Sequence, residues 1–127
     1  MQEKYLYEYA VIRLVPRVER EEFLNVGVVL FCKEKKFLKA LYNLYNTRVE
    51  TFCNTCDINE IETYLKAFEI ICEGEFNNGP ISQLPAAARF RWLTATRSTV
   101  VQTSKVHPGM CINPFEILQK LFKDLVC

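Results

Sequence analysis

The stretch YLYEYAVIRLV, residues 5–15, decides the fold, because apolar and aromatic residues fill both of its alternating sets of positions. A strand that is apolar on both faces belongs in the middle of a sheet. Pro16 ends it, since proline has no backbone N–H to give to a neighbouring strand. Two further strands are predicted next, NVGVVLFC at 25–32 and FLKALY at 37–42. Because only a short charged run separates these two, they form a hairpin, and the chain begins as an antiparallel meander.

Two residues of the second predicted strand indicate local irregularity. Gly27 lies inside the strand, where a glycine marks a bulge or a place at which another group approaches the backbone closely. Asn25 stands at the entrance of the strand, and its amide is predicted to bond neighbouring backbone.

Residues 57–72 predict an amphipathic helix. Asp57 is its expected N-cap, and Gly74 follows its expected end. A second helix is predicted over 114–126, with Asn113 as the cap and Pro114 at the first helical position. Its apolar stripe consists of Phe115, Leu118, Leu121, Phe122 and Leu125, and we expect Leu118 and Leu121 to lie in the core.

The region between the two predicted helices has a pattern that favours strands and turns. Residues 89–95 and 99–104 predict two short strands around a turn at Arg97 and Ser98, and His107-Pro108-Gly109 predicts a closing turn.

The predicted fold class is therefore α+β, with a three-to-five-stranded mainly antiparallel sheet and two amphipathic helices packed on it. A length of 127 residues predicts a single domain with one hydrophobic core. The loop at 73–85 does not divide it, because pieces of roughly 75 and 40 residues would each be marginally stable.

Composition restricts the class of protein. The formal net charge is +1, so no global field attracts nucleic acid or an anionic membrane, although a local basic patch stays open. Charges interrupt the N-terminal segment, so neither a signal peptide nor a membrane span is expected, and a cytoplasmic location is predicted. The six cysteines are accordingly predicted to be thiols. Cys53 and Cys56 with the single histidine provide too few ligands for zinc, so neither a metal nor another cofactor is predicted.

Readable catalytic motifs are lacking, which makes a non-enzymatic protein the favoured expectation. His107 has the chemistry of a general base, but an imidazole that ties down a turn is the favoured interpretation. Cys111 lies four residues further on, and the turn between them gives no assurance of hydrogen-bond contact.

The stretch RFRWLTATRSTVVQTSK, residues 89–105, is the most informative about ligands. Arginine forks beside hydroxyls suit an anion or phosphate, and alternation along a strand would place Arg89 and Arg91 on the same face. Basic strands that carry aromatic residues also bind single-stranded nucleic acid by stacking. An equally weighted alternative is a solvated sheet face over a buried Trp92.

Two stretches, YAVIRLVPRVEREEFLNVGVVLFC (9–32) and RFRWLTATRSTVVQTSKVHPG (89–109), resemble the bacterial domain of unknown function 3037 family. The residues that match its recurrent pattern are Arg20, Glu22, Asn25, Gly27, Arg91, Trp92, Arg97, Ser98, Thr99, Gln102, His107, Pro108 and Gly109. The chain departs from that pattern at Lys105, where proline is usual, and at Ile112-Asn113, where acidic residues are usual. The turn around His107 is therefore expected to differ.

Members of that family are often encoded beside a HipA-like kinase, which implies an accessory or regulatory partner. The predicted function is a non-enzymatic binding or regulatory module that engages a protein partner through the surface formed by the two stretches. The alternative is a domain, catalytic or not, that handles nucleic acid or a phosphorylated ligand through Arg91, Arg97 and His107. The predicted binding residues are Arg20, Glu22, Asn25, Arg91, Arg97, Ser98, Thr99, Gln102 and His107. Arg97 is expected to lie at least partly exposed at its turn and to contribute to binding.

Overall fold

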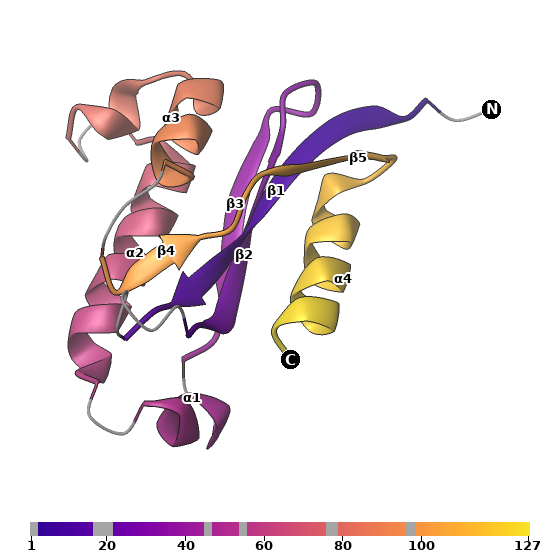
Figure 1. Ribbon diagram of the computed structural model, residues 1–127. Coiled ribbons are helices and arrows are strands. Elements are labelled where there is room, and N and C mark those ends of the chain that lie inside the picture. The colour runs from indigo at the N-terminus through magenta and orange to yellow at the C-terminus, as the bar shows by residue number, and fades with distance from the viewer. Residues whose placement is uncertain (1–2, 17–21, 45–46, 54–55, 76–78, 96–98) are drawn as a thin grey trace.

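The computed structural model describes residues 3–16, 22–44, 47–53, 56–75, 79–95 and 99–127, and it confirms the predicted α+β class (Figure 1). In chain order its elements are β1 (Tyr5–Leu14), β2 (Leu24–Cys32), β3 (Phe37–Tyr42), α1 (Thr47–Phe52), α2 (Ile58–Glu73), the 3₁₀ helix η2 (Ile81–Gln83), α3 (Ala86–Leu93), β4 (Val101–Thr103), β5 (His107–Cys111) and α4 (Pro114–Leu125). The predicted meander is confirmed, and β3 has the predicted bounds.

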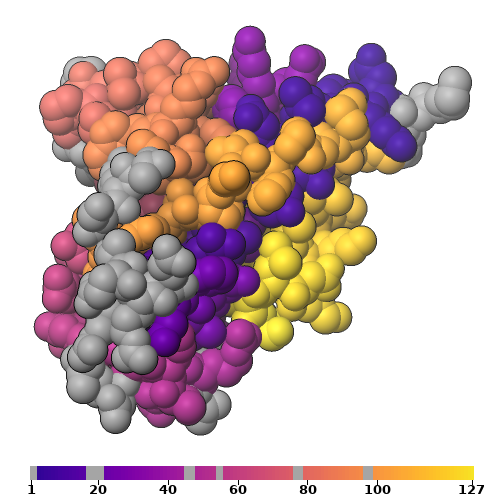
Figure 2. All heavy atoms as spheres, viewed as in Figure 1, coloured from indigo at the N-terminus to yellow at the C-terminus, as the bar shows by residue number. Residues whose placement is uncertain are grey.

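The five strands form one antiparallel sheet in the order β3-β2-β1-β4, with β5 also paired to β1. The two halves of β1 have different outer neighbours, because β5 pairs with Tyr5–Tyr9 and β4 pairs with Ile12–Leu14. Helices α2 and α3 cover one face of the sheet, and α4 covers the other (Figure 1). In the space-filling view the orange segment of β4 and β5 crosses indigo β1, with yellow α4 to one side (Figure 2).

Buried apolar residues form two clusters, so the expectation of one hydrophobic core was wrong. The larger cluster joins one face of the sheet to α2 and α3, and includes Ile12, Leu14 and Leu65. The smaller joins the other face to α4, and includes Val28, Leu30, Cys32, Leu118 and Val126. The physical reason is the alternation of side chains along β1 and β2, which gives each strand one apolar set on either face.

The predicted caps are confirmed. The Asp57 carboxylate accepts hydrogen bonds from the backbone N–H groups of Asn59 and Glu60 at 3.0 and 3.3 Å. Gly74 ends α2 with a left-handed φ of 67°. Asn113 accepts from the N–H groups of Phe115 and Glu116 at 3.0 and 3.4 Å at the start of α4. Local side-chain chemistry therefore determined where these two helices begin.

Two elements differ from their predictions. Residues 86–93 form helix α3, so the predicted strand over 89–95 was wrong. Alanine, arginine and leucine favour a helix, and Pro85 directly before the segment suits a helix start. His107-Pro108-Gly109 was predicted as a turn, but it belongs to strand β5, whose extended backbone pairs with the N-terminal half of β1. Helix α1, which has only six residues, was not predicted.

The prediction that all six cysteines are thiols was also wrong. Cys53 and Cys56 form a disulfide, whereas Cys32, Cys72, Cys111 and Cys127 are free. The prediction rested on the expected compartment of the protein, which does not determine the local geometry. Cys53 and Cys56 lie between the end of α1 and the start of α2, and their Cα atoms are 5.5 Å apart, a separation that suits a disulfide. No helix in the described parts of the chain has the length and apolar character needed to cross a membrane.

Candidate functional site

The two arginines of α3 point in different directions, which corrects the expectation that they share a face. Arg89 donates three hydrogen bonds to backbone carbonyl oxygens: from Nε to Leu84 at 2.9 Å, and from Nη1 to Ile71 and Cys72 at 2.7 Å each. It thereby satisfies carbonyls in the last turn of α2. Arg91 is exposed. Residues two apart in a helix are separated by about 200° around the axis, whereas in a strand they are aligned.

This difference predicts different effects of substitution. We expect Arg89→Ala to lower the free energy of unfolding by about 1 to 2 kcal/mol, because charge-assisted bonds to the end of α2 are lost. Arg91→Ala is the matched control and should change it by less than about 0.5 kcal/mol. Urea denaturation of both variants measures the difference. Equal losses would show that Arg89 does not hold α2 as described.

An apolar groove lies where α2, α3 and β4 meet. We define it by Tyr64, Ala67, Phe68, Ile71, Trp92, Leu93, Thr99 and Val101, which line a volume of about 150 Å³. Phe68, Leu93 and Val101 are buried, whereas Tyr64 is 40% exposed and Trp92 is 41% exposed. The alternative of a buried tryptophan was therefore wrong. Trp92 lies two residues after Phe90, whose ring packs against Phe31 of the sheet, and the helical rotation of about 200° between them turns the indole toward the surface.

A polar row crosses three strands on the face of the sheet that carries α4. Arg13 of β1 lies directly opposite Asn25 on β2 and opposite Gln102 on β4. Asn25 donates from Nδ2 to the Leu125 carbonyl at 3.2 Å, so it bonds backbone as predicted, but its partner is the end of α4, 100 residues along the chain, and not the neighbouring backbone. The Arg13 guanidinium lies 4.0 Å from the Phe23 ring centroid. Within the described residues, Nε of Arg13 and Oδ1 of Asn25 are buried without a hydrogen-bond partner.

His107 is exposed on β5, and its ring lies 5.3 Å from that of Tyr9, centroid to centroid. The interpretation that it ties down a turn was therefore wrong. Cys111 lies four residues along the same strand, which separates the two by about 13 Å. Cys111 is buried, and burial raises the pKa of its thiol, which is opposite to what a nucleophilic cysteine requires. These two residues do not form a nucleophile and base pair.

The predicted binding residues separate into groups. Arg20, Arg97 and Ser98 lie outside the described residues, and Glu22 is exposed just before β2. Thr99 lies in the apolar groove with Trp92, whereas Asn25 and Gln102 flank Arg13 on the opposite face. Arg91 and His107 also lie on opposite faces of the sheet, because α3 packs on one face and the His107 ring contacts Tyr9 on the other. The two predicted stretches thus supply separate surfaces.

Sequence reasoning missed two residues of these surfaces, and each carried a signal. Tyr64 is an aromatic residue one helical turn after Glu60, at the solvated margin of the predicted helix, and 40% of it is exposed. Arg13 is a charge near the end of a strand that is otherwise apolar on both faces. A large apolar residue on a solvated face, or a charge in a buried strand, is the informative exception to the usual pattern.

A family model described as "Protein of unknown function (DUF3037)" matches residues 9–126, which is nearly the whole chain. Comparisons with curated proteins and with solved structures give no match.

Proposed function

The chain belongs to the family of proteins of unknown function DUF3037, and from this premise we propose that it is a non-enzymatic binding module that engages a protein partner through the apolar groove. We place this activity in the bacterial cytoplasm. The observation that carries the proposal is the combination of a small apolar recess with two exposed aromatic residues at its rim.

The size of the groove favours a side chain of another protein over a small molecule. Its volume of about 150 Å³ is well below the roughly 300 to 1,000 Å³ of typical small-molecule sites. A recess of this size accommodates one apolar side chain. Tryptophan and tyrosine are enriched among the residues that dominate binding energy at protein interfaces, and both Trp92 and Tyr64 line the recess.

A HipA-like kinase is the first partner to test. The binding of a purified HipA-like kinase can be measured from the fluorescence emission of Trp92, the single tryptophan of the chain. We expect saturable binding and a shift of the emission maximum as the indole leaves water. Trp92→Ala should weaken the affinity roughly 30-fold, as for a residue that dominates an interface, measured by calorimetry because the fluorophore is lost.

Met110→Ala is the matched control, because Met110 is 55% exposed and lies outside the groove. It should bind like the wild type. If Trp92→Ala and Tyr64→Ala both bind like the wild type, the groove is not the site of interaction.

The alternative function, handling of nucleic acid or a phosphorylated ligand, makes a different prediction. It requires anisotropy of a labelled single-stranded oligonucleotide to rise with protein and to fall with salt. It also requires Arg91→Ala to weaken that binding. Salt-sensitive oligonucleotide binding that is lost in Arg91→Ala, without any kinase binding, would contradict the proposal and favour this alternative.

A further inference from the structure

Strand β3 forms one edge of the sheet in the described structure. The N–H of Asn43 donates to the Val26 carbonyl of β2 at 2.8 Å, which fixes the direction of the backbone groups along β3. Because these groups alternate along a strand, those of Lys39 and Leu41 point toward β2, and those of Leu38 and Ala40 point outward. The outward N–H and C=O groups can accept another strand.

A groove of about 320 Å³ runs along this edge and is separate from the apolar groove. Its floor is residues 38–41 of β3, and its wall is Glu69, Cys72 and Glu73 near the end of α2. Cys72 is buried, and burial raises the pKa of its thiol to about 12, so this part of the wall is uncharged at neutral pH. The charged residues that line the groove are therefore Lys39, Glu69 and Glu73.

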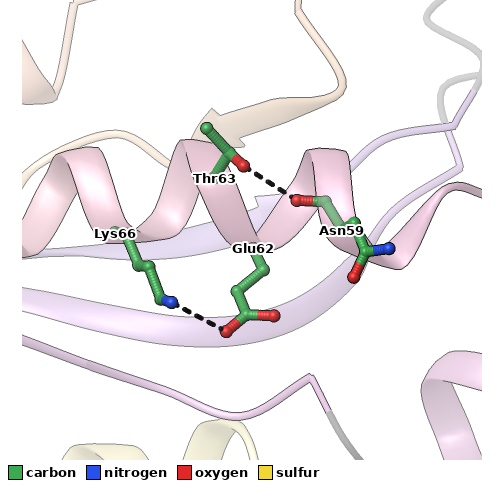
Figure 3. Close-up of polar contacts among 4 residues, drawn as sticks. All are labelled: Asn59, Glu62, Thr63 and Lys66. Carbon is green, nitrogen blue, oxygen red and sulfur yellow. Dashed lines mark hydrogen bonds and ion pairs between the residues drawn. The ribbon is translucent and has the colours of Figure 1, made fainter.

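Glu69 and Glu73 are exposed, and no ion pair joins either of them to another described residue. Two other polar side chains of α2 have partners within the helix: the Lys66 ammonium forms an ion pair with the Glu62 carboxylate at 3.3 Å, and the Thr63 hydroxyl donates to the Asn59 carbonyl at 2.9 Å (Figure 3). The ammonium of Lys39 lies over the Phe115 ring, 5.3 Å from its centroid, on the opposite face of the sheet. Among the described residues, the groove thus presents two carboxylates that form no ion pair, beside open backbone groups, and the nearest positive charge reported there is the Arg89 guanidinium bonded to the Cys72 carbonyl.

We propose that the edge of β3 binds an extended segment of another protein that carries lysine or arginine at alternate positions. Main-chain hydrogen bonds to Leu38 and Ala40 would add this segment to the sheet. Glu69 and Glu73 are one helical turn apart, about 6 Å along α2, and alternate side chains of a strand are about 6.6 Å apart. Two basic side chains on the face toward α2 therefore match the two carboxylates in spacing and in charge.

The test uses the whole protein and a fluorescein-labelled octapeptide of alternating lysine and valine. We expect saturable binding, weakened about tenfold by Glu69→Lys or Glu73→Lys. Asp124→Lys, the same charge reversal at an exposed site on α4, is the matched control and should have little effect. Hydrogen exchange gives the residue-level measurement: the peptide should newly protect the amides of Leu38 and Ala40, while those of Lys39 and Leu41 are already protected.

Two modified peptides separate sheet addition from simple charge attraction. N-methylation of alternate backbone nitrogens should abolish binding, and the same residues arranged as a lysine block followed by a valine block should bind more weakly. Equal binding of the block peptide, no change in either glutamate variant, or no new protection of Leu38 and Ala40 would each overturn the proposal. Trp92→Ala should leave peptide binding unchanged, so the outcome is independent of the function proposed for the apolar groove.

Discussion

Replacing Leu118 with alanine is expected to lower the free energy of unfolding by about 2 to 5 kcal/mol, which is a large part of the stability of a domain of this size. Leu118 is fully buried in the smaller apolar cluster, where α4 packs on β2. The truncation removes apolar contacts and leaves a cavity between a helix and a sheet that relax only partly. The prediction that Leu118 lies in the core is confirmed by its position.

Leu121 provides a graded comparison, because it is half-buried at the margin of the same cluster and not fully enclosed as predicted. Leu121→Ala should therefore cost less than Leu118→Ala, and Lys120→Ala, at an exposed position between them, should cost less than about 0.5 kcal/mol. Urea denaturation measures all three variants, with one common slope for the dependence of the free energy of unfolding on urea concentration. An unchanged midpoint in Leu118→Ala would mean that α4 does not dock on β2.

Gly27→Ala is expected to cost about 1 to 3 kcal/mol or more, because the site has no room for a methyl group. A Cβ atom at Gly27 would lie 2.6 Å from the carbonyl oxygen of Leu41 and 2.9 Å from Cβ of Tyr42. The Leu41 carbonyl oxygen belongs to the backbone of β3, and the Cβ atom of Tyr42 is bonded directly to that backbone. Neither atom can move alone, so strands β2 and β3 would have to separate. The pairing of β1 with β2 also shifts its register beside Gly27, between Ile12 and Arg13. Both predicted features of Gly27, a bulge and the close approach of another group, are therefore confirmed.

Gly109→Ala is the matched control, a second glycine-to-alanine change in a strand. The added methyl there would meet the ring of Tyr7, which is a side chain that can rotate away. We therefore expect a smaller loss of stability for Gly109→Ala than for Gly27→Ala, measured by thermal and urea denaturation. A Gly27→Ala variant as stable as the wild type would show that β3 yields more easily than its hydrogen bonds to β2 suggest.

The sequence by itself determined the meander and helices α2 and α4. In these elements the deciding interactions are local: alternation over a few residues, apolar spacing of three and four, and caps such as Asp57 and Asn113 that bond the backbone within three residues. The turn of lysines and a glutamate before Phe37 also sets the hairpin register without help from the rest of the chain. These signals can be read before any tertiary contact is known.

Only the tertiary structure decided where α3 packs, that β5 is a strand, and which surfaces carry the proposals. The residues of α3 favour a helix locally, but its position depends on Arg89, which bonds carbonyls 17 and 18 residues away. His107-Pro108-Gly109 has the composition of a turn, but the open edge of β1, about a hundred residues earlier in the chain, provides partners for extended backbone. The apolar groove and the free edge of β3 depend likewise on where α2 packs. Their contacts join residues far apart in sequence, and the free energy of such contacts does not appear in any local pattern.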